Sequence, residues 1–412
     1  MFNIVDQAKL FNEFLTPGVL AEVSSLSKLW DRIKKSDKIE ADGLYAKQKL
    51  LAAGGTSTRA ASTSSYPTAK SSTPGYHLVF MKRSQMFSMQ FDGFSLELAS
   101  KNGASMDPQE FEKKGLFINL SDDMSRQLMG DGGGVLAVVN GGVTGSAVVV
   151  VSHPLYANAT KFLKKDMVID IYNGATKQAD SVTILSVDST TQITLTAAVT
   201  VATAATIRQE DTYTASEGAG LGEMMGLDGI VRATDPPAPN ATAGLQSLLV
   251  ANDPEWKCYV NTAGSNRDIS ETLLETCFDN VEGYCKPSVM LATQGVRRAW
   301  AAKLVSYKQL PNQKVLWGGW SGLPFIYDGR EIPMVTDRFV PDNTLYGIDE
   351  SMLTLYVTKQ GQEITWEKGD AGGILQKVAG KNEFVAEGHI FSNLGTPMRK
   401  AVGFKLDKIT EV

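Results

Sequence analysis

The residue types that most often carry out chemistry are scarce in this sequence of 412 residues. Its three histidines are His77, His153 and His389, and none lies in H-x-x-x-H, H-E-x-x-H or H-x-E spacing. A zinc or other transition-metal site needs several such ligands at helix or loop spacing. Each histidine is therefore interpreted as a surface or packed residue. No metal site and no cofactor are predicted.

Cysteine and glycine patterns do not indicate a catalytic site either. Cys258, Cys277 and Cys285 form no C-x-x-C pair, and free thiols in a reducing compartment fit their spacing best. In GGWSGL at 318–323, leucine occupies the last position, where a nucleophile elbow has glycine. The glycine run at 130–134 follows an expected helix, whereas a dinucleotide loop follows a strand. We predict no catalytic residues.

Composition sets further limits on function. The chain has 40 Lys and Arg against 45 Asp and Glu, which gives a net charge of −5. A protein that reads nucleic-acid sequence usually carries a basic stripe, although a protein that only encloses nucleic acid need not. The N-terminus lacks the apolar core of a signal peptide, and no run approaches about 18 apolar residues. A membrane partner is therefore not expected.

The N-terminal part combines a helix with an arm that has no core of its own. Apolar residues at three- and four-residue spacing predict a helix that begins after Thr16-Pro17 and runs to Ile33, with Lys34 and Lys35 on its opposite face. Its apolar stripe must cover a surface, and another chain is one candidate. In residues 54–75, half are Ser or Thr and none is Leu, Ile, Val, Met or Phe. We favour an arm ordered by a neighbour over a disordered linker.

A long helix is the clearest single element. Asp107-Pro108 is an N-cap followed by proline at the first helical position, and Glu110 completes a capping box. Apolar residues line one face as far as Gly130, which predicts about 22 residues and a rod on the order of 30 Å.

The rest of the chain divides into a β-rich segment and a mixed segment. Short alternating stretches over 143–212 predict a small β-barrel or sandwich inserted in the chain. Residues 225–383 mix helices and strands, with a capping box at Asp268 and Glu271 and a helix over 293–305. The segment after 383 is read as strands that return to an earlier sheet. The fold class predicted is α+β.

In this order, the elements resemble the major capsid protein of tailed double-stranded-DNA bacteriophages, whose fold is shared with encapsulins and the herpesvirus capsid floor. The resemblance covers most of the chain apart from 143–212. The segments that carry it are Arg126–Gly132 with the GGVLAVV that follows, Met225–Val231, the helix–strand–helix pattern of 268–304, Leu323–Ile326, Ile332–Asp337 and Leu345–Leu353.

The resemblance implies a domain plan. Residues 1–46 would be an N-arm and 47–92 an extended loop. Residues 93–142 and 384–412 would form a peripheral domain with the spine helix, and 143–212 an inserted β module. A return connection at 213–224 would lead to an axial domain at 225–383.

The resemblance also implies a function without catalysis. Copies of the chain would assemble into hexamers and pentamers of an icosahedral or prolate shell that encloses double-stranded DNA without sequence-specific contacts. The expected partners are other copies, a separate scaffolding protein and a portal, with a decoration protein as a further option. The expected location is the virion capsid, assembled in the host bacterial cytoplasm. The residues expected at subunit contacts are Trp30, Arg59, Tyr66, Lys70, Arg126, Trp317 and Trp320.

Two other classes of protein stay open at this point. An encapsulin-like compartment shell would enclose an enzyme as its cargo. A hydrolase with a β-rich accessory domain would show a substrate-dependent activity that is lost when one carboxylate is changed.

Overall fold

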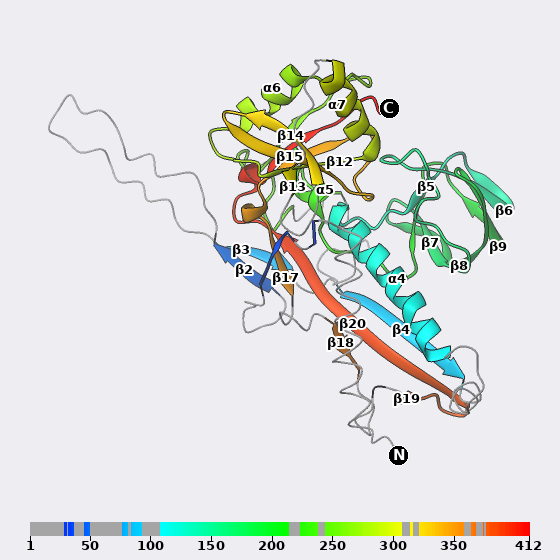
Figure 1. The fold of residues 1–412 in the computed structure, drawn as a ribbon. Helices are drawn as coiled ribbons and strands as arrows, with labels where there is room; N and C mark the ends of the chain where they lie inside the picture. Colours follow the sequence, from blue (N-terminus) through cyan, green and yellow to red (C-terminus); the bar gives the residue numbers. More distant parts are fainter. Residues whose placement is uncertain are drawn as a thin grey trace, which may run out of the picture.

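A computed structural model describes most of the chain (Figure 1). The described residues are 29–30, 32–36, 45–49, 76–80, 84–92, 108–213, 223–237, 244–306, 314–315, 321–357, 364–367, 374 and 376–412. They form two sheets, a closed barrel, a two-stranded pair and three α-helices of eleven or more residues. The mixture of helices and sheets is the α+β class that the sequence predicts.

The first sheet lies beside the long helix α4 (Pro108–Met129) (Figure 1). Strands β1, β17, β20 and β18 are neighbours in that order, and β4 and β19 also pair with β20. The helix has the predicted start and length, and it buries Leu120, Met124 and Leu128 against this sheet and the neighbouring segments. The strands of the first sheet are β1 (Lys34–Ser36), β4 (Ser84–Asp92), β17 (Thr354–Val357), β18 (Ile364–Trp366), β19 (Gln376–Lys377) and β20 (Glu383–Gly395).

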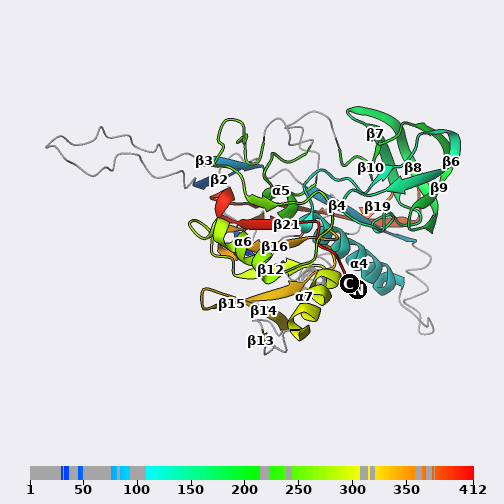
Figure 2. The same ribbon diagram turned by 90° about the horizontal axis from the view of Figure 1, so that it is seen from above.

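Six strands from one continuous stretch of chain close into a barrel, in the order β10-β5-β6-β9-β8-β7. Its strands bury an apolar core and also the charged side chains of Asp170 and Arg208. Figure 2 shows the barrel standing to one side of the two sheets. The barrel strands are β5 (Ala137–Val139), β6 (Val143–Ser152), β7 (Val168–Asn173), β8 (Thr176–Ser189), β9 (Gln192–Val201) and β10 (Thr206–Gln209).

The barrel therefore begins before the predicted β-rich segment. Residues 137–139, which the resemblance joined to the end of the long helix, form the first barrel strand. The reason is packing: the glycines at 130–134 end the helix, and Leu136, Ala137 and Val139 then enter the barrel core.

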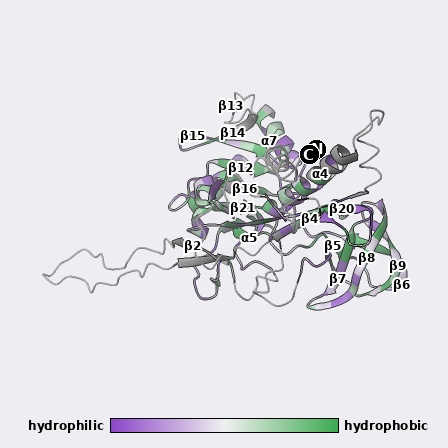
Figure 3. Ribbon diagram, turned by 90° about the horizontal axis from the view of Figure 1, so that it is seen from below, coloured by the Kyte–Doolittle hydropathy of each residue, from purple (hydrophilic) through white to green (hydrophobic). Residues whose placement is uncertain are grey.

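The second sheet has seven strands, in the order β11-β21-β16-β12-β15-β14-β13. Helix α6 (Glu271–Val281) contacts β11 and β21, and helix α7 (Gln294–Ser306) contacts β15. Figure 3 shows hydrophobic residues concentrated on its central strands, and every residue of β12 and β16 is buried. Its strands are β11 (Tyr259–Asn261), β12 (Val289–Ala292), β13 (Lys314–Val315), β14 (Ser321–Tyr327), β15 (Arg330–Thr336), β16 (Leu345–Ile348) and β21 (Gly403–Leu406).

The cap of α6 corrects one prediction. The N-cap is Ser270, whose side chain accepts a hydrogen bond from the Leu273 backbone N–H. Asp268 does not cap this helix, because the helix begins at Glu271 and only Ser270 directly precedes it.

The predicted N-terminal helix does not continue to Lys35. Leu29 O accepts hydrogen bonds from the backbone N–H groups of Arg32 and Ile33, which makes a single turn. Lys34 and Lys35 then lie in β1, which pairs in parallel with β17. The backbone partners that β17 offers explain the change from helix to strand. The rest of this predicted helix lies outside the described residues.

Strand pairing crosses the domain boundary predicted at 383/384. Strands β17, β18 and β19 precede the boundary but pair with β20, and β21 follows it but lies in the second sheet. A short helix, α5 (Leu227–Ile230), contacts α4, and β2 (Tyr45–Lys49) pairs with β3 (Tyr76–Phe80). Among the described residues no helix has the length and apolar character needed to cross a membrane.

Candidate functional site

The structure describes two of the seven residues predicted at subunit contacts. Trp30 is 1% exposed in the core that the first sheet and α4 share, and Arg126 is 8% exposed near the end of α4. The contacts that the structure shows for both lie within the chain, so a role between subunits stays a prediction. The other five, which lie outside the described residues, are Arg59, Tyr66, Lys70, Trp317 and Trp320.

Arg126 connects the long helix to the segment that returns from the barrel. Its Nη1 lies 2.8 Å from Glu223 Oε2, and its Nη2 lies 2.6 Å from Asp123 Oδ1, one turn earlier on α4. Burial disfavours the charge on Arg126, but the two carboxylates outweigh it and raise the pKa of this side chain. The arginine therefore stays charged and holds residue 223 against the helix.

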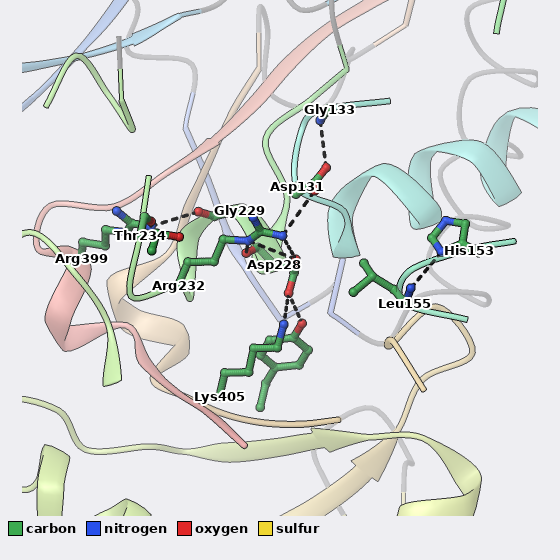
Figure 4. A network of polar contacts seen from close by, with 11 residues as sticks. Asp131, Gly133, His153, Leu155, Asp228, Gly229, Arg232, Thr234, Arg399 and Lys405 are labelled. Carbon is green, nitrogen blue, oxygen red and sulfur yellow. Dashed lines mark hydrogen bonds and ion pairs between the residues drawn. The ribbon is translucent and has the colours of Figure 1, made fainter. Parts of the chain in front are cut away.

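Five residues form a second polar cluster, which we call the charged junction: Asp131, Asp228, Arg232, Tyr346 and Lys405 (Figure 4). The Asp228 carboxylate is fully buried and accepts hydrogen bonds from Tyr346 Oη and Lys405 Nζ, both at 2.6 Å, and from Arg232 Nη2 at 2.7 Å. Arg232 Nη2 also lies 3.4 Å from Asp131 Oδ2.

The charged junction stabilises the ionised form of its central acid. Burial alone would raise the pKa of Asp228, but the charges of Lys405 and Arg232 and the hydrogen bonds lower it to about 2. The cluster joins the end of α4, helix α5 and strands β16 and β21. It therefore fixes the second sheet relative to the long helix.

Arg399 is buried beside this cluster and has a different set of partners. Its guanidinium donates to the backbone oxygens of Thr234, Ile230, Trp256 and Gly229, at 2.7, 2.8, 3.1 and 3.3 Å. Burial lowers the pKa of Arg399. The side chain connects the turn after β20 to the loops that follow α5.

The barrel is attached to the second sheet by a loop that follows β6. Tyr156 Oη donates to Phe339 O at 2.6 Å, and Lys161 Nζ donates to Arg338 O at 2.9 Å. Asp342 N donates to Leu155 O at 2.9 Å. Several independent contacts thus hold the barrel in one orientation.

His153 lies at the start of the same loop. Its Nδ1 accepts a hydrogen bond from the Leu155 backbone N–H at 3.1 Å (Figure 4), and its ring centre lies 4.8 Å from that of Tyr156. Burial lowers the pKa of His153 to about 4, so the imidazole is neutral at neutral pH. Of the two interpretations that the sequence allows, a surface or a packed histidine, His153 is the packed one.

A cleft of about 540 Å³ lies between β4, α4 and the barrel. Its rim carries charges of both signs, including Asp122 on α4 and Lys165 on the barrel side. Lys164 Nζ lies 2.9 Å from Asn119 Oδ1 and 3.5 Å from Asp122 Oδ2, so it bridges the barrel to the helix. These contacts position two parts of the fold.

The three cysteines are buried and protonated. Burial raises the pKa of Cys258 to about 12 and that of Cys277 to about 11, and it also raises the pKa of Cys285. A thiol with a raised pKa is a poor nucleophile. In the part of the chain that the structure describes, no group of three or more His, Cys, Asp or Glu could hold a metal ion.

The charged junction is not predicted from the sequence. Asp228 lies within the run Met225–Val231 and Lys405 within the final strands, and neither stands in a motif. The signal that could have found them is a single charge in an otherwise apolar stretch, since such a charge needs a partner when it is buried. That signal does not identify the partner, which comes from a distant part of the chain.

No protein-family model matches the sequence, and no curated protein is similar to it. The structure is similar to a chain of the cyanophage A-1(L) capsid asymmetric unit, with a TM-score of 0.52 and 12% identity over 96% of this chain and 93% of that chain. It is also similar to a chain of the holo-SrpI encapsulin complex from Synechococcus elongatus PCC 7942, with a TM-score of 0.47 and 8% identity over 94% and 89%.

At 12% identity the cyanophage similarity concerns the fold. This chain therefore shares the fold of that phage capsid chain, as the resemblance of its sequence implies.

Proposed function

We propose that this chain is the structural subunit of a closed protein shell of the phage-capsid kind and is not an enzyme. The observation that carries this proposal is the similarity of fold to the cyanophage A-1(L) capsid chain over 96% of this chain. The buried polar clusters support it, because their charges are paired within the fold and serve to position its parts.

In the proposed shell, copies form the hexamers and pentamers of an icosahedral or prolate capsid around double-stranded DNA. The net charge of −5 suits a protein that encloses DNA without reading its bases. Residues 1–46 would act as an N-arm, 47–92 as an extended loop over a neighbour, and 225–383 as the axial domain. A scaffolding protein, a portal and a decoration protein are proposed partners, and the virion is the proposed location.

Contacts between such copies are expected to be extensive. Obligate interfaces often bury about 2,000–5,000 Å². The side chains proposed there are Trp30, Arg59, Tyr66, Lys70, Arg126, Trp317 and Trp320. Since Trp30 and Arg126 are buried within one chain, their part in such contacts would be to hold the surrounding surface in shape.

The test is to purify the full chain, alone and with a candidate scaffolding protein, and to examine it by negative-stain electron microscopy and light scattering. Closed shells, tubes or rings of six or five copies are expected. A compact monomer at high concentration under every condition would overturn the proposal.

The content of shells isolated from their source separates a capsid from a compartment. A capsid should hold nuclease-protected double-stranded DNA. Shells that instead hold one folded enzyme and no protected DNA would favour the encapsulin-like alternative.

A further inference from the structure

Strand β4 has one edge without a strand partner among the described residues. It pairs with β20 along its whole length, from Ser84 opposite Phe391 to Asp92 opposite Glu383. Strands β18 and β19 pair with the same part of β20, so they lie on its other side. In an antiparallel pair, every second residue points its backbone N–H and C=O away from the partner. The free edge of β4 therefore offers a row of backbone groups to which a further strand can bind.

The cleft of about 540 Å³ lies along this free edge. Residues 85–88 of β4 form one wall, and α4 and the barrel form the others. A strand residue takes up about 3.4 Å along the strand, 4.8 Å across the sheet and 10 Å between layers, or roughly 160 Å³. The cleft therefore has room for at least about three to four residues of one extended strand. It has no room for the edge of another sheet that carries its own helix.

The walls of the cleft favour an occupant with small, uncharged side chains. Phe87, Leu116 and Phe162 are half-buried and contribute apolar surface from β4, α4 and the barrel side. The charges around the cleft are of both signs, with Lys165 and Glu210 among them. Neither net charge nor a deep apolar pocket selects the occupant, so backbone pairing with β4 must supply most of the recognition.

One segment of the sequence has the composition that this cleft requires. In residues 54–66, which we call the arm segment, every residue except Arg59 and Tyr66 is Gly, Ala, Ser or Thr. The arm segment contains no proline, which would remove a backbone donor from a strand. It also has no aliphatic side chain larger than alanine with which to build a core of its own. Its backbone groups can be paired by an existing sheet edge.

The position of the cleft favours an arm segment from a neighbouring copy. The arm segment lies in the chain between β2, which ends at Lys49, and β3, which begins at Tyr76. Figures 1 and 2 show β2 and β3 on the side of the first sheet away from the barrel. The cleft lies on the barrel side, between β4 and the barrel. The chain's own arm segment would have to turn back across the sheet, whereas that of a neighbour can enter from outside.

We propose that the arm segment of one copy adds as a strand to the free edge of β4 in a neighbouring copy, within the cleft between α4 and the barrel. This inference rests on the proposed function and specifies where one copy grips the next. Because the donated strand and the receiving edge differ, the contact is heterologous: each copy gives a strand to one neighbour and receives one from another. The barrel then has a role in assembly, since it forms one wall of the receiving cleft.

Disulfide trapping between single-cysteine variants of the full chain tests this contact. One batch carries Ser88→Cys, and the other carries Ser57→Cys, Ser62→Cys or Ser64→Cys in turn, which samples both faces of the added strand. The batches are mixed, allowed to assemble and oxidised. Paired residues on neighbouring strands have Cα atoms about 4.5–5.5 Å apart, within reach of a disulfide. At least one pairing should give a covalent dimer in about ten times the yield of the control, because docking holds the thiols at high effective concentration.

The matched control is Ser265→Cys in place of Ser88→Cys. It makes the same change at an exposed residue in the loop after β11, outside the residues that line the cleft. The three native cysteines are buried, which keeps them out of the oxidation. Circular dichroism and the thermal midpoint of unassembled protein check that each variant is folded.

Hydrogen exchange of the unmodified chain is a second readout that needs no substitution. Assembly should slow exchange about ten-fold or more at those amides of residues 85–88 that do not donate to β20, because the added strand accepts from them. Unchanged exchange at these amides in assembled protein would contradict strand addition.

The outcomes separate the contact from the function. A covalent dimer from mixed batches, with none from either batch alone, supports strand addition between copies. A disulfide that forms only when both cysteines are in one chain assigns the cleft to the chain's own arm segment and overturns the contact between copies. Assemblies without either cross-link overturn binding at β4 and leave the shell in place. An unmodified chain that forms no assembly overturns the proposed function itself.

Discussion

The barrel and the charged junction differ in what stabilises them and in how far apart in the chain their residues lie. The barrel comes from one stretch, residues 137–209, and its interior is mostly apolar; its buried carboxylate, Asp170, pairs with Lys177 at 2.9 Å, seven residues away in the chain. The charged junction joins residues as far apart as Asp131 and Lys405 through ion pairs and hydrogen bonds. The barrel strands pair with strands that are close in the sequence. The segments of the charged junction are far apart in the sequence and are joined by directional polar contacts.

Physical chemistry explains what each arrangement contributes. Apolar burial is non-directional and roughly proportional to the area removed from water, so it stabilises a barrel without demanding particular pairs. A buried charge without a partner costs several kcal/mol, so the charged junction is compatible with few arrangements of the second sheet against α4. The two regions should therefore respond differently to mutation and to pH.

Asp228→Asn should have the largest effect on stability, because it weakens the contact between the second sheet and α4. The amide cannot neutralise Lys405, which is 8% exposed, so the free energy of unfolding should fall by about 3–5 kcal/mol in urea titrations of unassembled protein. Asp253→Asn, at an exposed position, is the control and should change little. A loss below about 1 kcal/mol for Asp228→Asn would show that the charged junction does not hold the second sheet against α4.

Ile171→Ala should destabilise the barrel without destabilising the two sheets. Ile171 is fully buried in the barrel core, and truncation there should cost about 3 kcal/mol. Hydrogen exchange should accelerate in β7 and stay unchanged in β12, while Leu185→Ala at an exposed barrel position should affect neither. Equal acceleration in β12 would mean that barrel and sheets unfold as one unit.

His153 should make the barrel attachment sensitive to acid. Its pKa is about 4 in the folded chain, against about 6.5 when unfolded. Because the folded value is lower, stability is complete above pH 6.5 and falls as pH drops towards 4, by about 2–3 kcal/mol in all. Asp228, with a pKa of about 2, adds a loss only below about pH 4.

The measurement is the free energy of unfolding between pH 7 and 4.5 for His153→Gln, with His389→Gln as control. The decline should become shallower in His153→Gln and persist in His389→Gln, whose side chain pairs with exposed Glu367. An identical decline in His153→Gln would remove this histidine as its cause.

Tyr156→Phe should have the smallest effect on stability, because it weakens only the attachment of the barrel to the second sheet. Removing the hydroxyl leaves Phe339 O without its donor and should cost about 1 kcal/mol. The backbone amide of Asp342, which donates to Leu155 O in the same link, should exchange faster. Tyr172→Phe removes a matched hydroxyl contact to Tyr213 O and should leave Asp342 unaffected, so equal acceleration in both variants would contradict a local link.

Local elements could be predicted from the sequence to the extent that their signals are local. The start and end of α4 follow from Pro108 and Gly130, and the spacing of Leu120, Met124 and Leu128 identifies its buried face. The cap of α6 was placed two residues early because Asp268 and Ser270 are both good caps and only the helix start separates them. The sequence places Lys34 and Lys35 on a helix because the strand partner that they meet, β17, lies more than 300 residues away.

By itself, the sequence determined the long helix and the β-rich character of 143–212, because these depend on periodicity and turn residues close together in the chain. The capsid fold was implied by the resemblance of its segments to a known family. Only the tertiary structure decided the membership of the two sheets and the partners of Asp228, Arg126 and Arg399. These features depend on residues that meet only after folding, so no local pattern encodes which distant residue each one meets.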